Sequence, residues 1–381
     1  MTANFIAWNV AIIPDVLLIS FPNLYFQAFY RCNMFDQIVG HQQNKEFLER
    51  FLNREERPHA LLFYGPEGIG KCLLAKEFAR AFLCLGSPLE ARPCSRCESC
   101  RLLNFETGNF AHPDYLYFDP TTDEEQEKKK TKIISVNQIR SLIKQSAFGP
   151  TLSKHKICII NEADTMNTEA ANSLLKLLEE PPDKWFFILV ASSVSRLLPT
   201  ILSRVIQVRF TPLSVQETKN ALLNKDIPEA EADLLAHLSD GSLGQALRFR
   251  EERIMDFRNA ALKFVAEFPM QAPMTYLLNE DYFSDFIPSS GGNEQLQRFV
   301  AMTVSLLRDL LFVKSGLPDQ VFNTDALPQL RKIAGKWDAG RLHRATGAAQ
   351  EAAAAAVRRA NTKSVLDNLT FKINTCFEGR I

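Results

Sequence analysis

Apolar residues along this chain gather in short continuous runs that are separated by amphipathic segments. Five runs have the length and composition of buried strands, and they occupy residues 60–64, 115–118, 156–160, 185–191 and 206–210. Apolar residues recur at helical spacing in residues 73–83, 136–143 and 167–180. Ser135 precedes the second of these segments as a predicted N-cap, and Pro181 stops the third. Strands that alternate with helices predict an α/β fold for this part of the chain.

Beyond residue 210 the strand pattern stops and helical periodicity continues toward the C-terminus. Residues 283–293 contain the run Pro-Ser-Ser-Gly-Gly, which predicts a loop or linker. The alanine-rich segment 341–360 predicts one of several amphipathic helices. The C-terminal part of the chain is therefore expected to be helical throughout.

A glycine-rich turn joins the first predicted strand to the helix that follows it. From Gly65 to Cys72 it reads Gly-Pro-Glu-Gly-Ile-Gly-Lys-Cys, which matches the phosphate-binding loop except at its last position, where Ser or Thr is expected. Gly68 and Gly70 let backbone amides approach phosphates, and Lys71 adds a positive point charge. The sequence predicts nucleotide binding here, and a glycine-rich turn without a ligand is the alternative.

Two positions that normally hold Mg²⁺ are altered. Cys72 offers a thiol, which is a poor ligand for a hard cation. The strand 156–160 ends in Asn161-Glu162-Ala163-Asp164, where a carboxylate is expected first. Glu162 remains as a candidate base, with plain surface charge as the alternative for Glu162 and Asp164. The pair of changes argues against hydrolysis and leaves binding of ATP or ADP open.

Four cysteines form a cluster with the spacing of a metal site. Cys84 is followed after nine residues by Cys94, and then by Cys97 and Cys100 at Cys-x-x-Cys spacing. Four thiolates fill the tetrahedral coordination of a structural Zn²⁺ and leave no position for a catalytic water. A redox pair or four separate core cysteines are the alternatives.

Composition narrows the class of protein only slightly. The chain has 381 residues, of which 46% are hydrophobic and 23% charged, as in ordinary globular proteins of two or three domains. Lys+Arg and Asp+Glu both number 44, so net charge predicts no general attraction to nucleic acid. Eight cysteines without a secretory context favour a reducing, cytoplasmic location. The polar segment 121–132 is expected to be a solvated loop.

The first 33 residues differ from the rest of the chain. They are rich in apolar residues and contain no Lys or Arg before Arg31. The basic start and cleavage site of a signal peptide are missing, and the uninterrupted apolar run is too short to span a membrane. We expect residues 1–33 to be a misassigned start or a disordered extension.

The order of these motifs resembles the clamp-loader subunits of bacterial DNA polymerase III, with the delta-prime type as the best match over residues 34–381. The matching segments are 35–41, the phosphate loop, the cysteine cluster, His-Pro-Asp at 112–114, Leu-Lys-Leu-Leu-Glu-Glu-Pro-Pro at 175–182 and Leu-Pro-Thr-Ile-Leu-Ser-Arg at 198–204. The family's Ser-Arg-Cys motif gives an arginine finger in trans to ATP on an adjacent subunit. That role falls on Arg204, although Val205 replaces the cysteine.

The resemblance also implies a fold and a domain order. It implies an AAA+ type nucleotide-binding domain with a parallel sheet at 34–210, which carries a zinc module at 84–114. A helical lid at 211–275 and a helical collar for oligomerisation at 276–381 would follow. Motor subunits of the family carry an arginine in the lid that senses nucleotide, and Gly244 stands at that position here.

These implications describe a stator, a subunit that does not hydrolyse ATP by itself but belongs to the DNA polymerase III holoenzyme. Its partners would be the delta and gamma/tau subunits in a hetero-pentamer, with the sliding clamp and primed DNA reached through the complex and no membrane involved. One rival hypothesis is an active motor ATPase of the same machine. Another is a zinc-dependent nucleic-acid binding module, although few basic residues flank the cysteines, namely Arg92, Arg96 and Arg101.

Overall fold

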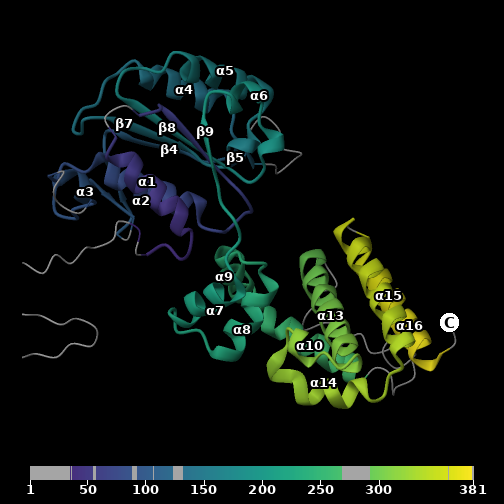
Figure 1. The fold of residues 1–381 in the computed structure, drawn as a ribbon. Helices are drawn as coiled ribbons and strands as arrows, with labels where there is room; N and C mark the ends of the chain where they lie inside the picture. The colour runs from purple at the N-terminus through teal and green to yellow at the C-terminus, as the bar shows by residue number, and fades with distance from the viewer. Residues whose placement is uncertain are drawn as a thin grey trace, which may run out of the picture. The chain divides into compact units, whose positions relative to one another are not determined.

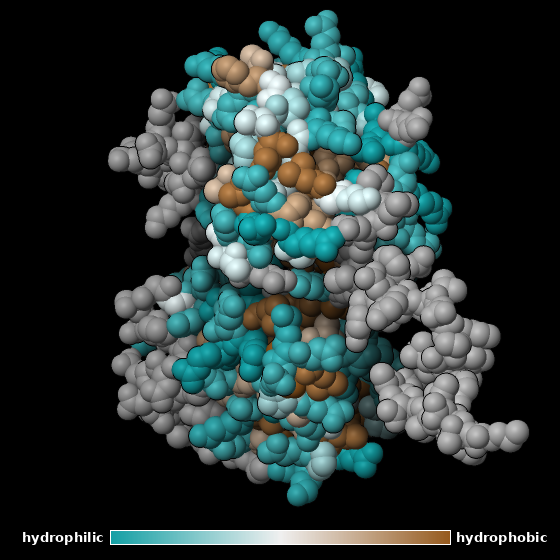
Figure 2. All heavy atoms as spheres, turned by 90° about the vertical axis from the view of Figure 1, so that its left-hand side faces the viewer, coloured by the Kyte–Doolittle hydropathy of each residue, from teal (hydrophilic) through white to brown (hydrophobic). Residues whose placement is uncertain are grey.

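The computed structural model describes residues 35, 37–54, 57–87, 92–105, 107–122, 132–267, 292–358 and 360–379. The expectation for residues 1–33 lies outside this part of the chain, as do those for most of the polar segment 121–132 and the linker at 283–293. Within the described residues, no helix is both long and apolar enough to cross a membrane. Figure 2 shows that hydrophilic residues cover much of the face it draws, with hydrophobic residues exposed between them.

A five-stranded parallel sheet forms the centre of the N-terminal part. The strands lie in the order β4, β7, β8, β1, β9, and every neighbouring pair is parallel. Their bounds are β1 Ala60–Tyr64, β4 Tyr115–Phe118, β7 Lys156–Ile160, β8 Trp185–Ala191 and β9 Ile206–Arg209. The five apolar runs of the sequence are these five strands. The prediction of an α/β fold with a parallel sheet is confirmed.

Helices cover both faces of the sheet (Figure 1). Alternate residues of β1 point to opposite faces, so Leu61 and Phe63 pack with one hydrophobic cluster while Ala60 and Leu62 pack with another. On the first face lie α1 Gln42–Leu52 and α2 Lys71–Leu83, and on the second lie α4 Val136–Ser146, α5 Thr168–Glu179 and α6 Pro199–Leu202. Burial on both faces explains why the strands are almost continuously apolar.

Side-chain caps fix where the helices of the second face begin. Ser135 accepts from the backbone N–H of Gln138, whose side chain accepts from the Ser135 backbone, so α4 starts with a complete capping box. Asn167 accepts from the backbone N–H of Ala170 at the start of α5. The predicted N-cap at Ser135 is confirmed.

A small module lies between α2 and β4. It contains α3 Glu98–Leu102 and a hairpin of β2 Leu103–Asn104 with β3 Asn109–Phe110. Two further short strands, β5 Thr121–Thr122 and β6 Lys132–Ile133, pair after β4.

Buried hydrogen bonds attach this module to the sheet domain. His112 Nε2 lies 2.9 Å from Ser99 Oγ and 3.3 Å from Ser153 Oγ, and both hydroxyls donate to the carbonyl of Leu83 at the end of α2. The carboxylate of Asp114 is fully buried and accepts three backbone N–H groups, from residues 151, 152 and 153. The His-Pro-Asp motif of the sequence therefore has a structural task here.

The C-terminal part is helical, as predicted. Its helices are α7 Val215–Leu223, α8 Glu229–Leu238, α9 Leu243–Glu251, α10 Ile254–Glu267, α13 Asn293–Lys314, α14 Leu327–Ala334, α15 Ala339–Val357 and α16 Thr362–Glu378. The short 3-10 turns η5 Pro318–Gln320 and η6 Thr324–Ala326 lie between α13 and α14. One hydrophobic cluster runs from Leu222 to Cys376, so the helices of the expected lid and collar share a continuous core.

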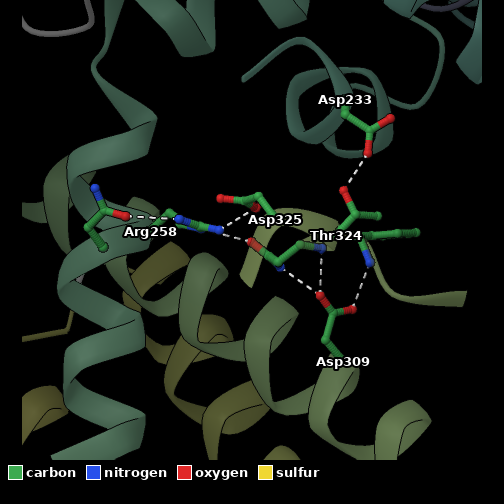
Figure 3. Close-up of polar contacts among 8 residues, drawn as sticks. Asp233, Arg258, Asp309, Thr324 and Asp325 are labelled. Atoms are coloured by element: carbon green, nitrogen blue, oxygen red, sulfur yellow. Dashed lines mark hydrogen bonds and ion pairs between the residues drawn. The ribbon is translucent and has the colours of Figure 1, made fainter. Parts of the chain in front are cut away.

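A buried polar network reinforces that core (Figure 3). Asp309 on α13 has no exposed surface and accepts from the backbone N–H groups of residues 322 and 323 and from the amide of Asn323. Arg258 on α10 donates to Asn323 and forms an ion pair with Asp325 at 2.5 Å. Thr324 donates to Asp233 on α8. The turn at η6 is thereby bonded to three helices, α8, α10 and α13.

Candidate functional site

The phosphate loop has the backbone conformation that its glycines allow. Gly65, Gly68 and Gly70 have φ angles of 148°, 74° and 102°, values that other residues rarely adopt. A Cβ atom at Gly65 would lie 2.3 Å from the carbonyl oxygen of Phe210. The loop ends where α2 begins, so the N-terminal amides of that helix face the same space. The strand, loop and helix arrangement expected of a phosphate-binding loop is present.

Lys71 is the first residue of α2, and its side chain is bonded to the loop itself. The ammonium donates to the carbonyl oxygens of Gly65 at 2.7 Å and Pro66 at 2.5 Å, and the residue is only 6% exposed. Burial lowers the pKa of Lys71, while the carboxylates of Asp164 and Glu67 act in the opposite direction. A phosphate would have to replace these carbonyl oxygens as the partner of the ammonium.

Cys72 belongs to a chain of polar side chains that are bonded to each other. Its Sγ lies 3.6 Å from the hydroxyl of Tyr117, which donates to Asp119 at 3.3 Å. Asp119 also accepts from the side-chain amide of Asn161 at 2.8 Å. Burial raises the pKa of Cys72, so the neutral thiol is favoured. The two altered positions of the sequence, 72 and 161, are therefore connected through the hydrogen bond between Tyr117 and Asp119.

Glu162 and Asp164 have different surroundings. Glu162 lines the cavity beside the loop, and burial together with the nearby Asp119 raises its pKa. Asp164 is buried and accepts from the backbone and the hydroxyl of Ser192 and from the backbone of Ser193. Asp164 is therefore neither surface charge nor a free base, and it holds the end of β8 in place.

The lid helix α9 rests directly on the phosphate loop. The backbone N–H of Gly244 donates to the carbonyl of Gly68 at 2.8 Å, and the hydroxyl of Ser242 donates to the carbonyl of Glu67 at 2.9 Å. Arg248 forms an ion pair with the carboxylate of Glu67 at 2.9 Å. A Cβ atom on Gly244 would lie 2.8 Å from the carbonyl oxygen of Gly68. This close approach explains why the position expected to hold a sensing arginine is a glycine.

A cavity of about 460 Å³ lies between the loop, the ends of β7 and β8, and the lid. Gln37, Ile38 and Val39 line one side of it. The backbone of the loop fits a phosphate group. Position 72 offers a thiol in place of an oxygen ligand, and position 161 offers a neutral amide in place of a carboxylate, so both are poorer ligands for Mg²⁺ than the expected residues.

The four cysteines of the cluster converge. Their sulfur atoms all lie within 4.8 Å of one another, although they come from the end of α2, a loop and the start of α3. Sulfurs around a tetrahedral Zn²⁺ are about 3.8 Å apart, and Cys84 and Cys97 are 4.0 Å apart. Backbone N–H groups of residues 86, 94, 97 and 100 point at sulfurs of the cluster. Four separate core cysteines are excluded, and the arrangement fits a closed zinc site.

Arg204 lies in the turn between α6 and the edge strand β9. Its Nη1 donates to the carbonyl of Thr200 at 2.9 Å and to the hydroxyl of Ser203 at 3.1 Å. Its Nη2 forms an ion pair with Glu179 at 2.8 Å, and the arginine side chain is 34% exposed. The guanidinium is therefore held in place while part of it faces solvent.

Sequence reasoning missed several residues of these sites. Asp119 follows β4 directly, and the rule that parallel strands end at one edge of a sheet could have placed it beside Asn161. Glu67 and Arg248 are far apart in the chain, and no sequence motif indicated that they form an ion pair. Glu179 belongs to a motif that was noted, but only the fold brings it to Arg204.

Comparison with known proteins identifies the family of this chain. Residues 40–214 match the family model described as DNA polymerase III, delta subunit. DNA polymerase III subunit delta′ of Pseudomonas aeruginosa is 35% identical over 238 residues, which are 62% of this chain and 69% of that protein. The delta′ subunit of Bacillus subtilis is 28% identical over 291 residues, 76% of this chain and 82% of that protein.

A tau subunit also matches this chain, but over a smaller share of its own length. DNA polymerase III subunit tau of Bacillus subtilis is 29% identical over 60% of this chain, but the match spans 40% of that protein. Both delta′ relatives are covered over most of their length. The chain therefore belongs to the DNA polymerase III delta′ family of clamp-loader subunits.

Proposed function

We propose that this chain is a stator of the bacterial DNA polymerase III clamp loader, which does not hydrolyse ATP itself and supplies Arg204 to the ATP of a neighbouring motor subunit. The observation that carries the proposal is a contrast within one domain. At its own loop a thiol, Cys72, and a neutral amide, Asn161, stand where oxygen and carboxylate ligands of Mg²⁺ are expected, whereas Arg204 is present and keeps a partly exposed guanidinium. An arginine from a neighbour stabilises the charge that develops on the transferring phosphate.

In this proposal the chain works inside a complex. Its partners are the delta and gamma/tau subunits in a hetero-pentamer that opens the sliding clamp and loads it onto primed DNA. Residues 34–210 form the AAA+ domain, 211–275 the lid and 276–381 the collar through which subunits associate. ATP or ADP at its own loop is optional, because the loop backbone fits phosphate but the metal ligands are missing.

Zinc has a structural role in this proposal. Cys84, Cys94, Cys97 and Cys100 hold the ion with four thiolates, and no position is left for water. The bonds of Ser99 and His112 then connect the zinc module to the end of α2. Two of the nearby basic side chains, Arg92 and Arg101, donate to carbonyls within the module, which does not favour a nucleic-acid contact there.

The test is ATP hydrolysis by the reconstituted loader in the presence of primed DNA. We expect Arg204→Ala to assemble normally and to slow hydrolysis at the neighbouring site by about a thousandfold or more. The isolated chain should be silent, and Lys71→Ala should leave hydrolysis by the loader nearly unchanged. If the isolated chain turns over ATP and loses this activity with Lys71→Ala, while Arg204→Ala changes nothing, the chain is a motor.

A further inference from the structure

The guanidinium of Arg204 is bonded through part of its donors only. Three of its five N–H donors are used, two by Thr200 and Ser203 and one by Glu179. Among the residues that the structure describes, Nε–H and one N–H of Nη2 have no partner at hydrogen-bond distance. These remaining donors are the kind of pair that binds two oxygens of a phosphate. The contacts of Arg204 therefore fix the side chain and leave donors for a ligand.

Glu179 stands where its own helix does not favour a carboxylate. It is the last residue of α5, and the C-terminus of a helix carries a partial negative charge. Glu180, the C-cap residue, adds a second acidic side chain at the same end. The contact that offsets this arrangement is the ion pair of Glu179 with Arg204 at 2.8 Å. The position of Glu179 is thus explained by the arginine and not by the stability of α5.

The packing of α5 against α6 sets the distance between the two side chains. Leu174 and Leu178 of α5 and Ile201 of α6 belong to the same hydrophobic cluster and are at most 1% exposed. The ion pair lies at the surface above this core, with Arg204 34% and Glu179 47% exposed. An exposed pair of this kind adds little to the stability of the fold. Its removal can therefore be studied without loss of the structure.

We propose that Glu179 is a positioning residue for Arg204, which holds the guanidinium of the arginine in one place before the neighbouring nucleotide is met. The inference rests on the proposed function of Arg204 as a finger. A free arginine side chain loses much rotational freedom when it binds a phosphate. The ion pair with Glu179 restricts the side chain beforehand, so less conformational entropy is lost in that step. Because the finger acts on charge that develops during phosphoryl transfer, Glu179 affects kcat of the neighbouring site more than KM for ATP.

The experiment compares four variants in the reconstituted loader, with kcat and KM for ATP measured separately. Glu179→Ala should lower kcat about fivefold with KM unchanged, because the arginine side chain must then be ordered during the reaction itself. Glu179→Gln keeps an acceptor oxygen in the same place and should retain most of the wild-type rate. Glu180→Ala removes the adjacent carboxylate as a matched control and should behave as wild type. Arg204→Ala supplies the reference for complete loss of the finger.

The outcomes separate this inference from the function on which it rests. If Arg204→Ala abolishes hydrolysis at the neighbouring site but Glu179→Ala has the wild-type or a higher kcat, the finger stands and the positioning role is wrong. Equal losses in Glu179→Ala and Glu180→Ala would also overturn the positioning role. If Arg204→Ala changes nothing, the proposed function itself fails. Thermal unfolding of each variant, expected to match wild type, shows that the fold is retained.

Discussion

Helix α2 carries a cysteine at each end, and the two thiols have opposite properties. Cys72, in the first turn, is buried beside Tyr117, and burial raises its pKa. Cys84, the C-cap residue, contacts Cys100 and backbone N–H groups, and these contacts lower its pKa to about 4. The same residue type is thus a separate buried thiol at one end and one of four converging sulfurs at the other. The comparison teaches that convergence of donors, and not the residue itself, decides what a cysteine binds.

The surroundings of the two ends differ in the same way. At the N-terminal end, the groups that would meet a nucleotide and its metal are bonded to the protein: Lys71 to loop carbonyls, Asn161 to Asp119, and the loop backbone to the lid. At the C-terminal end, four sulfurs point at one another within 4.8 Å. The two ends of α2 thus differ in geometry: donors at the N-terminal end are bonded to separate partners, whereas the four sulfurs at the C-terminal end face a common point.

Removal of one thiolate from the C-terminal end should have the largest effect. We expect Cys97→Ala to lose bound zinc and to lower the free energy of unfolding by several kcal/mol, because the ion holds a module with little core of its own. Zinc content is measured by atomic emission and stability by urea unfolding. Cys72→Ala, at the other end of α2, is the control and should keep one zinc per chain. A zinc-free Cys97→Ala protein with wild-type stability would contradict a structural site.

Addition of a single methyl group at the N-terminal end tests how tightly the lid lies on the loop. Gly244→Ala places a Cβ atom 2.8 Å from the carbonyl of Gly68, and we expect a loss of about 1–3 kcal/mol in the free energy of unfolding. Gly347→Ala in α15 is the matched control. No heavy atom lies within 4 Å of its Cβ position, so it should be neutral or slightly stabilising. Equal effects of both substitutions would show that the lid does not rest on the loop.

Mild acid should lower the free energy of unfolding by a smaller amount than these substitutions, through one histidine near each end of α2. His41 contacts the carbonyl of Ile69 in the phosphate loop, and His112 contacts Ser99 beside the cysteines. Burial lowers the pKa of both histidines below the ordinary value of 6.5. As the pH falls, these histidines are therefore protonated at a higher pH in the unfolded chain than in the folded one. The stability that the neutral histidines contribute is present above pH 6.5 and is lost as the pH falls below that value.

We expect the free energy of unfolding in urea to decrease by about 1 kcal/mol between about pH 7.5 and about pH 5.5. His112→Gln removes one of the two titrating groups and should show a smaller decrease over the same interval, even if its stability at neutral pH is lower. If His112→Gln shows the same decrease in free energy of unfolding as the wild type, protonation of His112 does not contribute to the loss of stability in acid.

The strands and most helices of this fold could be predicted from the sequence because each carries a local signal. All five strands are apolar runs, and α4 begins at the predicted cap Ser135. The phosphate loop and the cysteine cluster were found because their function depends on spacing within a short segment. The sequence pattern was sufficient to predict each feature that lies within one short segment of the chain.

Contacts between distant segments could not be predicted in this way. The role of Asp164 as an acceptor for Ser192 and Ser193 depends on the neighbouring strand β8. The pairing of Arg204 with Glu179 depends on how α6 packs on α5. The contact of Gly244 with Gly68 joins residues that are separated by the whole sheet domain. In each case the partner is set by tertiary packing, which residue spacing does not encode.

The contact between Gly68 and Gly244 also limits how this chain could change by mutation. A Cβ atom on Gly244 would lie 2.8 Å from the carbonyl oxygen of Gly68, and a Cβ atom on Gly68 would lie 2.4 Å from Ser242 Oγ, so neither position leaves room for a side chain. An arginine at 244 would have to be accompanied by a shift of the lid away from the loop. Close packing of the lid on the loop therefore restricts which residues positions 68 and 244 can hold.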